Sequence, residues 1–374
     1  MKTWQTELIS FTDNPYIAEY FTPSSVFFDI ETTGFSAARC QIYMIGYAHL
    51  AGDQICITQL FAENLSEEPE ILSAFLDILS CYDTLISFNG TGFDVPFLKS
   101  RCAHYKLPEH LDSFRHLDIY KQISGCKNIL NLPNLKQKTL EKFLGIARED
   151  VYSGGDLISV YSEYANKNGA QASVSSEEAC ALLKLHNYED MEGMLKLLPL
   201  LAYPCFFEGH FQVSSWETHS WNTYEGAEGL ELILSLEPEL PLPKAFACSL
   251  GNLYISACCS LIKLRIELFT GELKYFYPDY KNYYYLPMED TALHKSVAAY
   301  VDRDYRVQAT AATCYCKKSG RFLPQYQELF VPSFKQEYQD KISWFELTEN
   351  FTGNKDTLKK YAVHFINFSF SLYG

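Results

Sequence analysis

Short apolar runs alternate with amphipathic helical patterns through the first part of the chain, and this alternation constrains the fold more than any other feature. Each run is rich in aromatic and β-branched side chains, as β-strands are. Between the later runs, apolar residues recur with the helical period. The order β-β-β-α-β-α-β therefore predicts an α/β domain in which helices pack on a mixed sheet. We expect strands at 25–31, 41–49, 54–61, 83–88 and 116–120, and helices at 68–79 and 93–104.

The pattern changes along the rest of the chain. Ser175-Ser-Glu-Glu178 has the spacing of a capping box, which predicts a long helix that runs to about Leu201. A short amphipathic helix is expected at 134–144, and residues 153–175 have the composition of a loop with some helix. Further on, we expect strands at 230–236, 245–250, 252–257, 261–269 and 272–277, a turn at Thr270-Gly271 and a helix near 292–300.

A domain boundary is expected near residues 205–225. Residues 1–210 contain 15 basic and 27 acidic residues, whereas the charges of residues 211–374 are nearly balanced. The two parts also differ in their predicted elements. We therefore predict a first domain at 1–210 and a second, smaller α+β domain at 211–374 that is rich in antiparallel strands.

The whole chain carries 31 basic and 46 acidic residues, which gives a formal net charge of −15. A passive nucleic-acid coat would be basic overall, so the charge counts against this class. It does not exclude an enzyme that binds a polyanion through metal ions. No run of about 18 apolar residues, as a membrane-spanning helix needs, occurs. The first residues are acidic and polar where a signal peptide needs an apolar run. We expect a cytoplasmic protein without a membrane partner.

The strongest chemical signal is Phe27-Phe-Asp-Ile-Glu31 at the end of the first predicted strand. Side chains alternate along a strand, so Asp29 and Glu31 project from the same face. Two carboxylates held side by side need a cation or a shared proton. Divalent ions such as Mg²⁺ or Mn²⁺, which prefer oxygen ligands, meet that need. A solvated acidic strand end is the alternative, and the apolar run before Asp29 argues against it.

Two further acids follow in patterns that are ambiguous by themselves. Asp94 comes after the glycine-rich turn Asn89-Gly-Thr-Gly, in the first turn of a predicted helix, where an acid also complements the helix dipole. His186 and Asp190 are four residues apart on the long helix and hence lie on one face of it. Because their neighbours on that face are apolar, the pair points to the interior or to a cleft. A structural His–Asp pair is the alternative.

Together, these motifs resemble the DEDD (DnaQ-like) 3′–5′ exonuclease superfamily, which has a ribonuclease H-like fold. The resemblance covers about residues 20–205, and within the superfamily the chain is most similar to the YprB-type ribonuclease H-like proteins. It implies that Asp29, Glu31, Asp94 and Asp190 bind two Mg²⁺ or Mn²⁺ ions. It also implies metal-dependent hydrolysis of phosphodiester bonds by a two-metal-ion mechanism, most simply as a 3′–5′ exonuclease that degrades DNA or RNA from a single-stranded end.

The third motif departs from the family pattern. One subgroup of the superfamily has Tyr-x3-Asp at this place and another has His-x4-Asp, whereas this chain has His186-x3-Asp190. We predict that His186 is the general base or positions the attacking water, since imidazole titrates near neutrality. The unusual spacing leaves open whether its ring can reach that water.

Residues around the motifs are candidates for substrate binding. Asn89 and the backbone at Thr32 and Thr33 are expected to hold the terminal nucleotide, with Phe93 packed nearby. Lys136 and Lys138 lie on the predicted helix at 134–144, in a run that resembles a helix of the YprB-type proteins, and are candidates for phosphate contacts. The sequence specifies no protein partner.

Two alternatives to an active nuclease stay open. The first is a catalytically weak, nuclease-like module that binds nucleic acid, and the second is a scaffold that recruits a protein through its second domain. The tyrosine-rich run 274–285 interleaves aromatic rings with cations, a pattern found in surfaces that stack single-stranded bases. Aromatic cross-strand pairs within a sheet explain the same pattern, and we favour this interpretation.

Overall fold

The computed structural model describes residues 1–8, 15–52, 54–165, 175–222, 228–250 and 253–373. The chain divides into two compact units, Met1–Pro204 and Cys205–Gly374. The division falls shortly before the boundary that we placed at residue 210. The short helix α8 (Ala202–Phe207) runs across it in sequence. None of the helices in the described ranges combines the length and the apolar character that crossing a bilayer requires.

A six-stranded mixed sheet is the centre of the first unit, with the order β1-β4-β3-β2-β5-β6. β2 is parallel to β5, and β5 to β6, whereas the other pairs are antiparallel. The predicted α/β class and mixed sheet are confirmed. The strands are β1 (Lys2–Leu8), β2 (Ser25–Thr32), β3 (Ile42–Ala51), β4 (Gln54–Phe61), β5 (Thr84–Ser87) and β6 (Arg115–Asp118).

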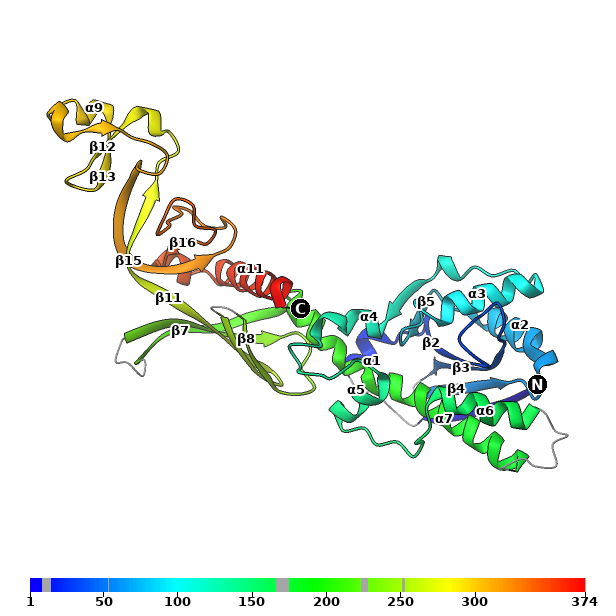
Figure 1. Ribbon diagram of the computed structural model, residues 1–374. Helices are drawn as coiled ribbons and strands as arrows, with labels where there is room; N and C mark the ends of the chain where they lie inside the picture. The colour runs from blue at the N-terminus through cyan, green and yellow to red at the C-terminus, as the bar shows by residue number, and fades with distance from the viewer. Residues whose placement is uncertain (9–14, 53, 166–174, 223–227, 251–252, 374) are drawn as a thin grey trace. The chain divides into compact units, whose positions relative to one another are not determined.

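Helices cover both faces of this sheet, as Figure 1 shows, with α2 and α3 on one side and α6 and α7 on the other. On the α2 side, Phe28 and Ile30 of β2 join a core with Phe75 of α2 and Leu98 of α3. The helices of this unit are α1 (Pro15–Tyr20), α2 (Glu68–Leu79), α3 (Asp94–Tyr105), α4 (Ile119–Ile123), α5 (Gln137–Leu144), α6 (Gly154–Ala165) and α7 (Ser176–Leu197).

Local signals fix several ends of these helices. The Ser175 side chain accepts a hydrogen bond from the Glu178 amide, and the Glu178 side chain accepts one from the Ser175 amide, so the predicted capping box is formed. α5 ends at Gly145, whose φ of 81° lies in the left-handed region that favours glycine. Strand β1 and helix α1 were missed by the sequence analysis. Of the predicted loop at 153–175, the first part is α6, and residues 166–174 lie outside the described residues.

The second unit is built on antiparallel strands, which confirms the predicted strand-rich α+β character. One sheet has the order β16-β15-β11-β10-β9, and β8 pairs with both β11 and β7. Its strands are β7 (Phe211–Asn222), β8 (Glu228–Pro238), β9 (Phe246–Leu250), β10 (Leu253–Cys258), β11 (Leu261–Phe276), β15 (Tyr315–Gln325) and β16 (Ser343–Glu346). A three-stranded sheet contains β12 (Tyr283–Leu286), β13 (Thr291–His294) and β14 (Val307–Gln308), and the helices are α9 (Lys295–Ala298), α10 (Glu349–Thr352) and α11 (Lys355–Tyr373).

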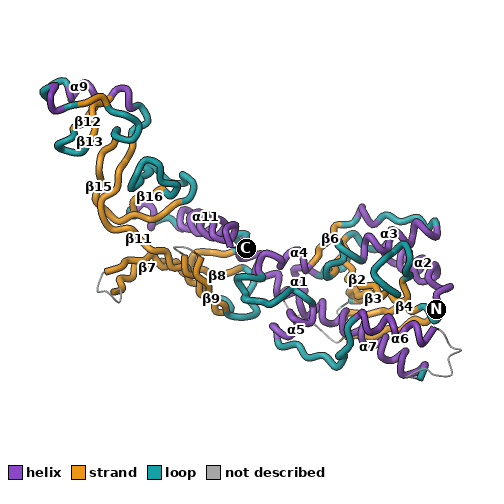
Figure 2. The backbone as a smooth tube through the Cα atoms, viewed as in Figure 1, coloured by secondary structure: helices purple, strands orange, loops and turns teal. Residues whose placement is uncertain are grey.

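One prediction for the second unit is wrong, and another is right only in part. The turn expected at Thr270-Gly271 is absent: β11 continues through it because Gly271 pairs with Gly320 of β15, and Figure 2 shows both strands as long, continuous segments. The expected helix near 292–300 is formed only in part: the residues up to His294 belong to β13, which pairs with β12, and the single helical turn α9 follows. In the tyrosine-rich run, Tyr277 and Tyr283 stack at 4.6 Å between ring centroids, as expected for packing between aromatic rings.

Candidate active site

Strand β2 presents two acids toward helix α7. β2 lies between β3 and β5, so it is a central strand. Asp29 and Glu31 share one face of it, opposite to the face that contributes Phe28 and Ile30 to the core. Asp29 pairs with Gly46 of β3, and the register of this pairing shifts after Glu31. Glu31 is buried, with 8% of its surface exposed, and Asp29 is partly buried.

The third acid comes from the start of α3. Asp94 is the first residue of this helix and is buried. Its Oδ1 accepts a hydrogen bond of 3.2 Å from the backbone amide of Ile30, between the two acids of β2. The preceding turn is fixed by Asp118, which accepts hydrogen bonds from the amides of Asn89 and Thr91 and from the Thr91 hydroxyl. The structure therefore places Asp94 beside the β2 acids.

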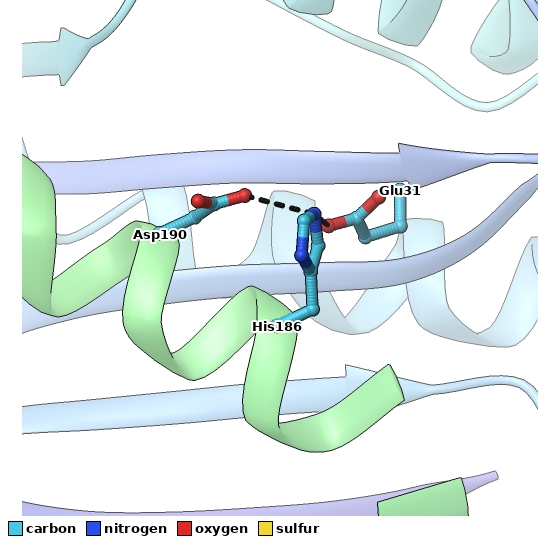
Figure 3. Close-up of side chains that lie close together, drawn as sticks. All are labelled: Glu31, His186 and Asp190. Carbon is cyan, nitrogen blue, oxygen red and sulfur yellow. Dashed lines mark ion pairs between the residues drawn. The ribbon is translucent and has the colours of Figure 1, made fainter. Parts of the chain in front are cut away.

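Helix α7 contributes the fourth acid together with His186. The Nε2 atom of His186 lies 3.2 Å from Oδ2 of Asp190 and 3.6 Å from Oε1 of Glu31, as Figure 3 shows. The imidazole ring is almost fully buried, with 4% of its surface exposed. A ligand atom of each of these three residues lies within 4.8 Å of the others. The three-residue spacing thus allows the ring to face the acids.

Asn187 also belongs to this site, although the sequence analysis missed it. Its Nδ2 donates a hydrogen bond of 3.1 Å to Oδ2 of Asp29, and its Oδ1 accepts one from Gln59. A Cβ atom at Gly46 would lie 2.4 Å from Oδ1 of Asn187. Glycine at position 46 is therefore what lets the Asn187 side chain reach the sheet beside Asp29.

Burial raises the pKa of three of these acids, Asp29, Glu31 and Asp94. Burial raises the pKa of Asp29 well above its usual range, and the charges of Asp94, Glu31 and Asp190 raise it further. Burial raises the pKa of Glu31 to about 8, where a protonated His186 opposes the shift and Asp190 adds to it. Burial also raises the pKa of Asp94 to about 7. At neutral pH the negative charges of these carboxylates are therefore unfavourable unless protons or cations neutralise them.

A buried arginine and a further aspartate contact Asp190 and His186 of α7 and hold their side chains in place. Arg148 Nη1 lies 2.7 Å from Oδ1 of Asp190 and 3.1 Å from Oε1 of the buried Glu141. Asp150 Oδ2 lies 2.7 Å from Nδ1 of His186 and 2.9 Å from Nζ of Lys138. Sequence reasoning missed both residues because they come from the segment between α5 and α6, which has no recognisable pattern of its own.

The residues predicted to contact the terminal nucleotide differ in how far they are already engaged by neighbouring residues. The Thr32 hydroxyl donates to the carbonyl of Gly34, and the Thr33 hydroxyl accepts from the amide of Gln41, so both hydroxyls have local partners. Asn89 is exposed, with a left-handed φ of 61°. Phe93 packs against Phe97 and the exposed Phe35.

The two lysines differ in their environments. Lys138 binds Asp150, whereas Lys136 is exposed immediately before α5. The α5 helix reaches the site through Gln137, which donates a hydrogen bond to the backbone carbonyl of Asp190. Lys136 is therefore the better placed of the two for contact with a ligand from solvent.

The first unit has a recognisable family. The profile of the RNase_H superfamily matches residues 26–202, a range that contains all strands of the central sheet except β1, the helices on both of its faces and all four acids. This match covers most of the first unit and somewhat less than half of the whole chain. A search among curated proteins finds no match.

Several solved structures share weak likeness with the chain. The family B DNA polymerase of the archaeon Pyrobaculum calidifontis is 16% identical, with a TM-score of 0.36 over 69% of this chain and 35% of that one. Exonuclease I of Methylocaldum szegediense is 11% identical, with a TM-score of 0.27 over 57% and 54%. E. coli exonuclease I in complex with an oligonucleotide is 12% identical, with a TM-score of 0.26 over 58% and 55%.

This chain matches about a third of the length of the polymerase and about half of the length of the exonucleases. With TM-scores below 0.5, these likenesses carry no inference about its activity. The family and the geometry of the site are what bear on its function.

Proposed function

We propose that the first unit is a metal-dependent nuclease that hydrolyses phosphodiester bonds of DNA or RNA. The observation that carries this proposal is the meeting of four carboxylates from β2, α3 and α7 in one largely buried pocket. Burial raises the pKa of Asp29, Glu31 and Asp94, and repulsion by the other acids of the cluster raises the pKa of Asp29 and Glu31 further. Such a pocket is costly without cations, and it lies in a fold whose superfamily includes nucleases.

The donor set fits two hard divalent cations. Carboxylate oxygens are the ligands that Mg²⁺ and Mn²⁺ prefer. Asp29, Glu31, Asp94 and Asp190 would hold these ions. When bound, a pair of such ions makes hydroxide available near neutral pH and stabilises the charge of the leaving oxygen.

The residues of the chain itself orient these acids. Asn187 holds one oxygen of Asp29, the Ile30 amide holds one oxygen of Asp94, and Arg148 holds one oxygen of Asp190. Fixing one oxygen of a carboxylate fixes the direction of the other, so the pocket is preorganised for its ligand. The turn that Asp118 holds at Asn89–Thr91 precedes Asp94 directly, and we assign it to the terminal nucleotide.

From the resemblance of the motifs to the DEDD superfamily, we propose that the reaction is hydrolysis at the 3′ end of a single strand, in the 3′–5′ direction. His186 is a further polar group beside these acids, and from the sequence we assign it the role of a general base. Its Nε2 faces Glu31 and Asp190. In this role, His186 would take a proton from a water molecule held between Glu31 and Asp190.

Digestion of end-labelled strands tests the proposal. Single-stranded DNA and RNA, labelled at the 5′ end, are incubated with the full chain in Mg²⁺ or Mn²⁺. We expect progressively shortened labelled products from the wild type and none from Asp29→Ala. Asp112→Ala is the matched control, because the Asp112 side chain is 90% exposed on the surface. If Asp29→Ala and the wild type degrade the strands equally, the site is misassigned.

A further inference from the structure

The ring of His186 has two nitrogens in very different surroundings. Nδ1 lies 2.7 Å from Oδ2 of Asp150. Asp150 also accepts from Lys138 and from the backbone amide of Tyr152. Both of these groups can only donate, so Asp150 is arranged as an acceptor, and a hydrogen bond from Nδ1–H fits that arrangement. The proton of a neutral imidazole is therefore on Nδ1, and the lone pair of Nε2 points away from Asp150.

That lone pair meets two further carboxylates. Nε2 lies 3.2 Å from Oδ2 of Asp190 and 3.6 Å from Oε1 of Glu31 (Figure 3). Three atoms that all carry lone pairs repel each other unless a proton on Nε2 or a metal cation lies among them. With metal–ligand bonds of about 2.0–2.2 Å, adjacent ligand atoms are about 2.8–3.1 Å apart in octahedral sites and about 3.3–3.6 Å apart in tetrahedral sites. The two observed separations are close to these ranges.

The partners of these three residues match the surroundings of metal-binding histidines. Such a histidine commonly donates its second ring N–H to a carboxylate, which fixes the tautomer and the orientation of the ring. Asp150 is in that position. On the other side, Arg148 engages Oδ1 of Asp190 at 2.7 Å, and Oδ2 of the same carboxylate faces His186. The ring itself is almost fully buried and cannot turn toward solvent.

We propose that His186 is itself a metal ligand, through Nε2, in a site shared with Glu31 and Asp190 and oriented by Asp150. The proposal rests on the metal-dependent activity proposed above and changes one role in it. A nitrogen whose lone pair is on a cation cannot accept a proton, so His186 is a ligand in place of a general base. Imidazole suits transition metals more than Mg²⁺. This position therefore selects Mn²⁺, Co²⁺ or Zn²⁺ over Mg²⁺.

Pulsed electron paramagnetic resonance of Mn²⁺ bound to the full chain tests the ligand directly. We expect the spectrum of the wild type to contain a coupling from one directly bound ¹⁴N nucleus. Labelling histidine with ¹⁵N replaces that coupling by one from ¹⁵N without changing the fold. His186→Gln, which offers an amide oxygen of similar reach, removes the nitrogen coupling. A wild-type spectrum without nitrogen coupling overturns the proposal, as does a coupling that persists in His186→Gln.

Calorimetric titration measures the selectivity. In the wild type we expect Zn²⁺ to bind far more tightly than Mg²⁺. In His186→Gln, Zn²⁺ affinity falls on the order of 100-fold while Mg²⁺ affinity changes little. Asp150→Asn, which permits the other tautomer, lowers Zn²⁺ affinity by about 10–100-fold. An unchanged ratio of Zn²⁺ to Mg²⁺ affinity in both variants contradicts the proposed ligand.

The outcomes separate this inference from the proposed function. If Mn²⁺ binds through oxygen ligands alone and labelled strands are degraded, the nitrogen ligand is refuted and the nuclease stands. If the nitrogen coupling is present but no strand is degraded, the metal ligand stands and the nuclease is refuted. If the wild type binds no Mn²⁺, both are refuted.

Discussion

Glu31→Gln should stabilise the first unit when no metal is bound, although it removes a side chain from the proposed active site. The pKa of Glu31 is raised from 4.5 to about 8 by burial and by its acidic neighbours. A group whose pKa is higher in the folded than in the unfolded state makes folding less favourable as the pH rises between the two values. The loss of folding free energy caused by ionising Glu31 is absent below pH 4.5, grows between pH 4.5 and pH 8, and is constant above pH 8.

The pKa values give the magnitude. At about 1.4 kcal/mol for each pH unit, the cost at pH 7 is about 3 kcal/mol. Neighbouring acids change their own protonation in response, so the gain expected from Glu31→Gln at pH 7 is about 1–3 kcal/mol. At pH 5 the same calculation gives less than about 1 kcal/mol.

Urea unfolding in the presence of a chelator, followed by pulsed hydrogen exchange, provides the assay. Exchange resolved to peptides of α7 reports on the first unit separately. Tryptophan fluorescence does not, because Trp216, Trp221 and Trp344 lie in the second unit and only Trp4 lies in the first. The free energy of unfolding is compared between the wild type and Glu31→Gln at pH 5, 7 and 8.

Glu68→Gln is a control in the same unit that should change the free energy of unfolding in the opposite direction. Glu68 is fully buried, accepts from Arg101 at 2.6 Å and 2.8 Å, and has a lowered pKa in spite of its burial. Removing this charge leaves Arg101 unpaired and should destabilise by about 3–5 kcal/mol. If Glu31→Gln destabilises the metal-free protein at pH 7 and 8 as well, the idea of an electrostatically strained pocket is refuted.

Three further substitutions test other parts of the account. Arg148→Met leaves Glu141 and one oxygen of Asp190 without their buried cation, so we expect a loss of about 3–5 kcal/mol in the same urea assay; an unchanged free energy would show that this charge is dispensable. Gly46→Ala places a Cβ where the Asn187 side chain lies. A loss of about 1–3 kcal/mol is expected, and an unshifted Asn187 side-chain amide signal in NMR spectra would count against that clash. Lys136→Ala should weaken binding of a single strand and reduce the slope of log affinity against log salt by about 0.7; an identical slope would remove Lys136 from the interface.

Much of the first unit follows from local sequence. The alternation of apolar runs and helical patterns predicted the strands around Asp29 and the helices that follow. The alternation of side chains on a strand placed Asp29 and Glu31 on one face, and the helical period placed His186 and Asp190 together. These relations act over four residues or fewer, which is why the sequence alone reveals them.

The partners of the acids could not be found in that way. Asp150 lies 36 residues from His186 in sequence, and Asn187 lies 158 residues from Asp29. Their positions follow from how α7 and the segment after α5 pack against the sheet, and no local pattern encodes that packing. Asn187 carried one signal, its place beside His186, but an asparagine inside a helix gives no indication of its partner.

The second unit was harder to predict for a related reason. The first part of β11 pairs with β8 and β10, whereas its last part pairs with β15. Thr270-Gly271 separates these two parts and has the composition of a turn, yet the pairing of Gly271 with Gly320 keeps the strand extended. Long-range pairing overrides local propensity at such positions.

Diffraction from crystals of the full chain soaked in Mn²⁺ tests the central claim most directly, because anomalous scattering locates the ions without reference to activity. The account predicts two Mn²⁺ ions about 4 Å apart, bound by oxygens of Asp29, Glu31, Asp94 and Asp190. Anomalous peaks elsewhere on the chain, with none among these four carboxylates at saturating Mn²⁺, would contradict it.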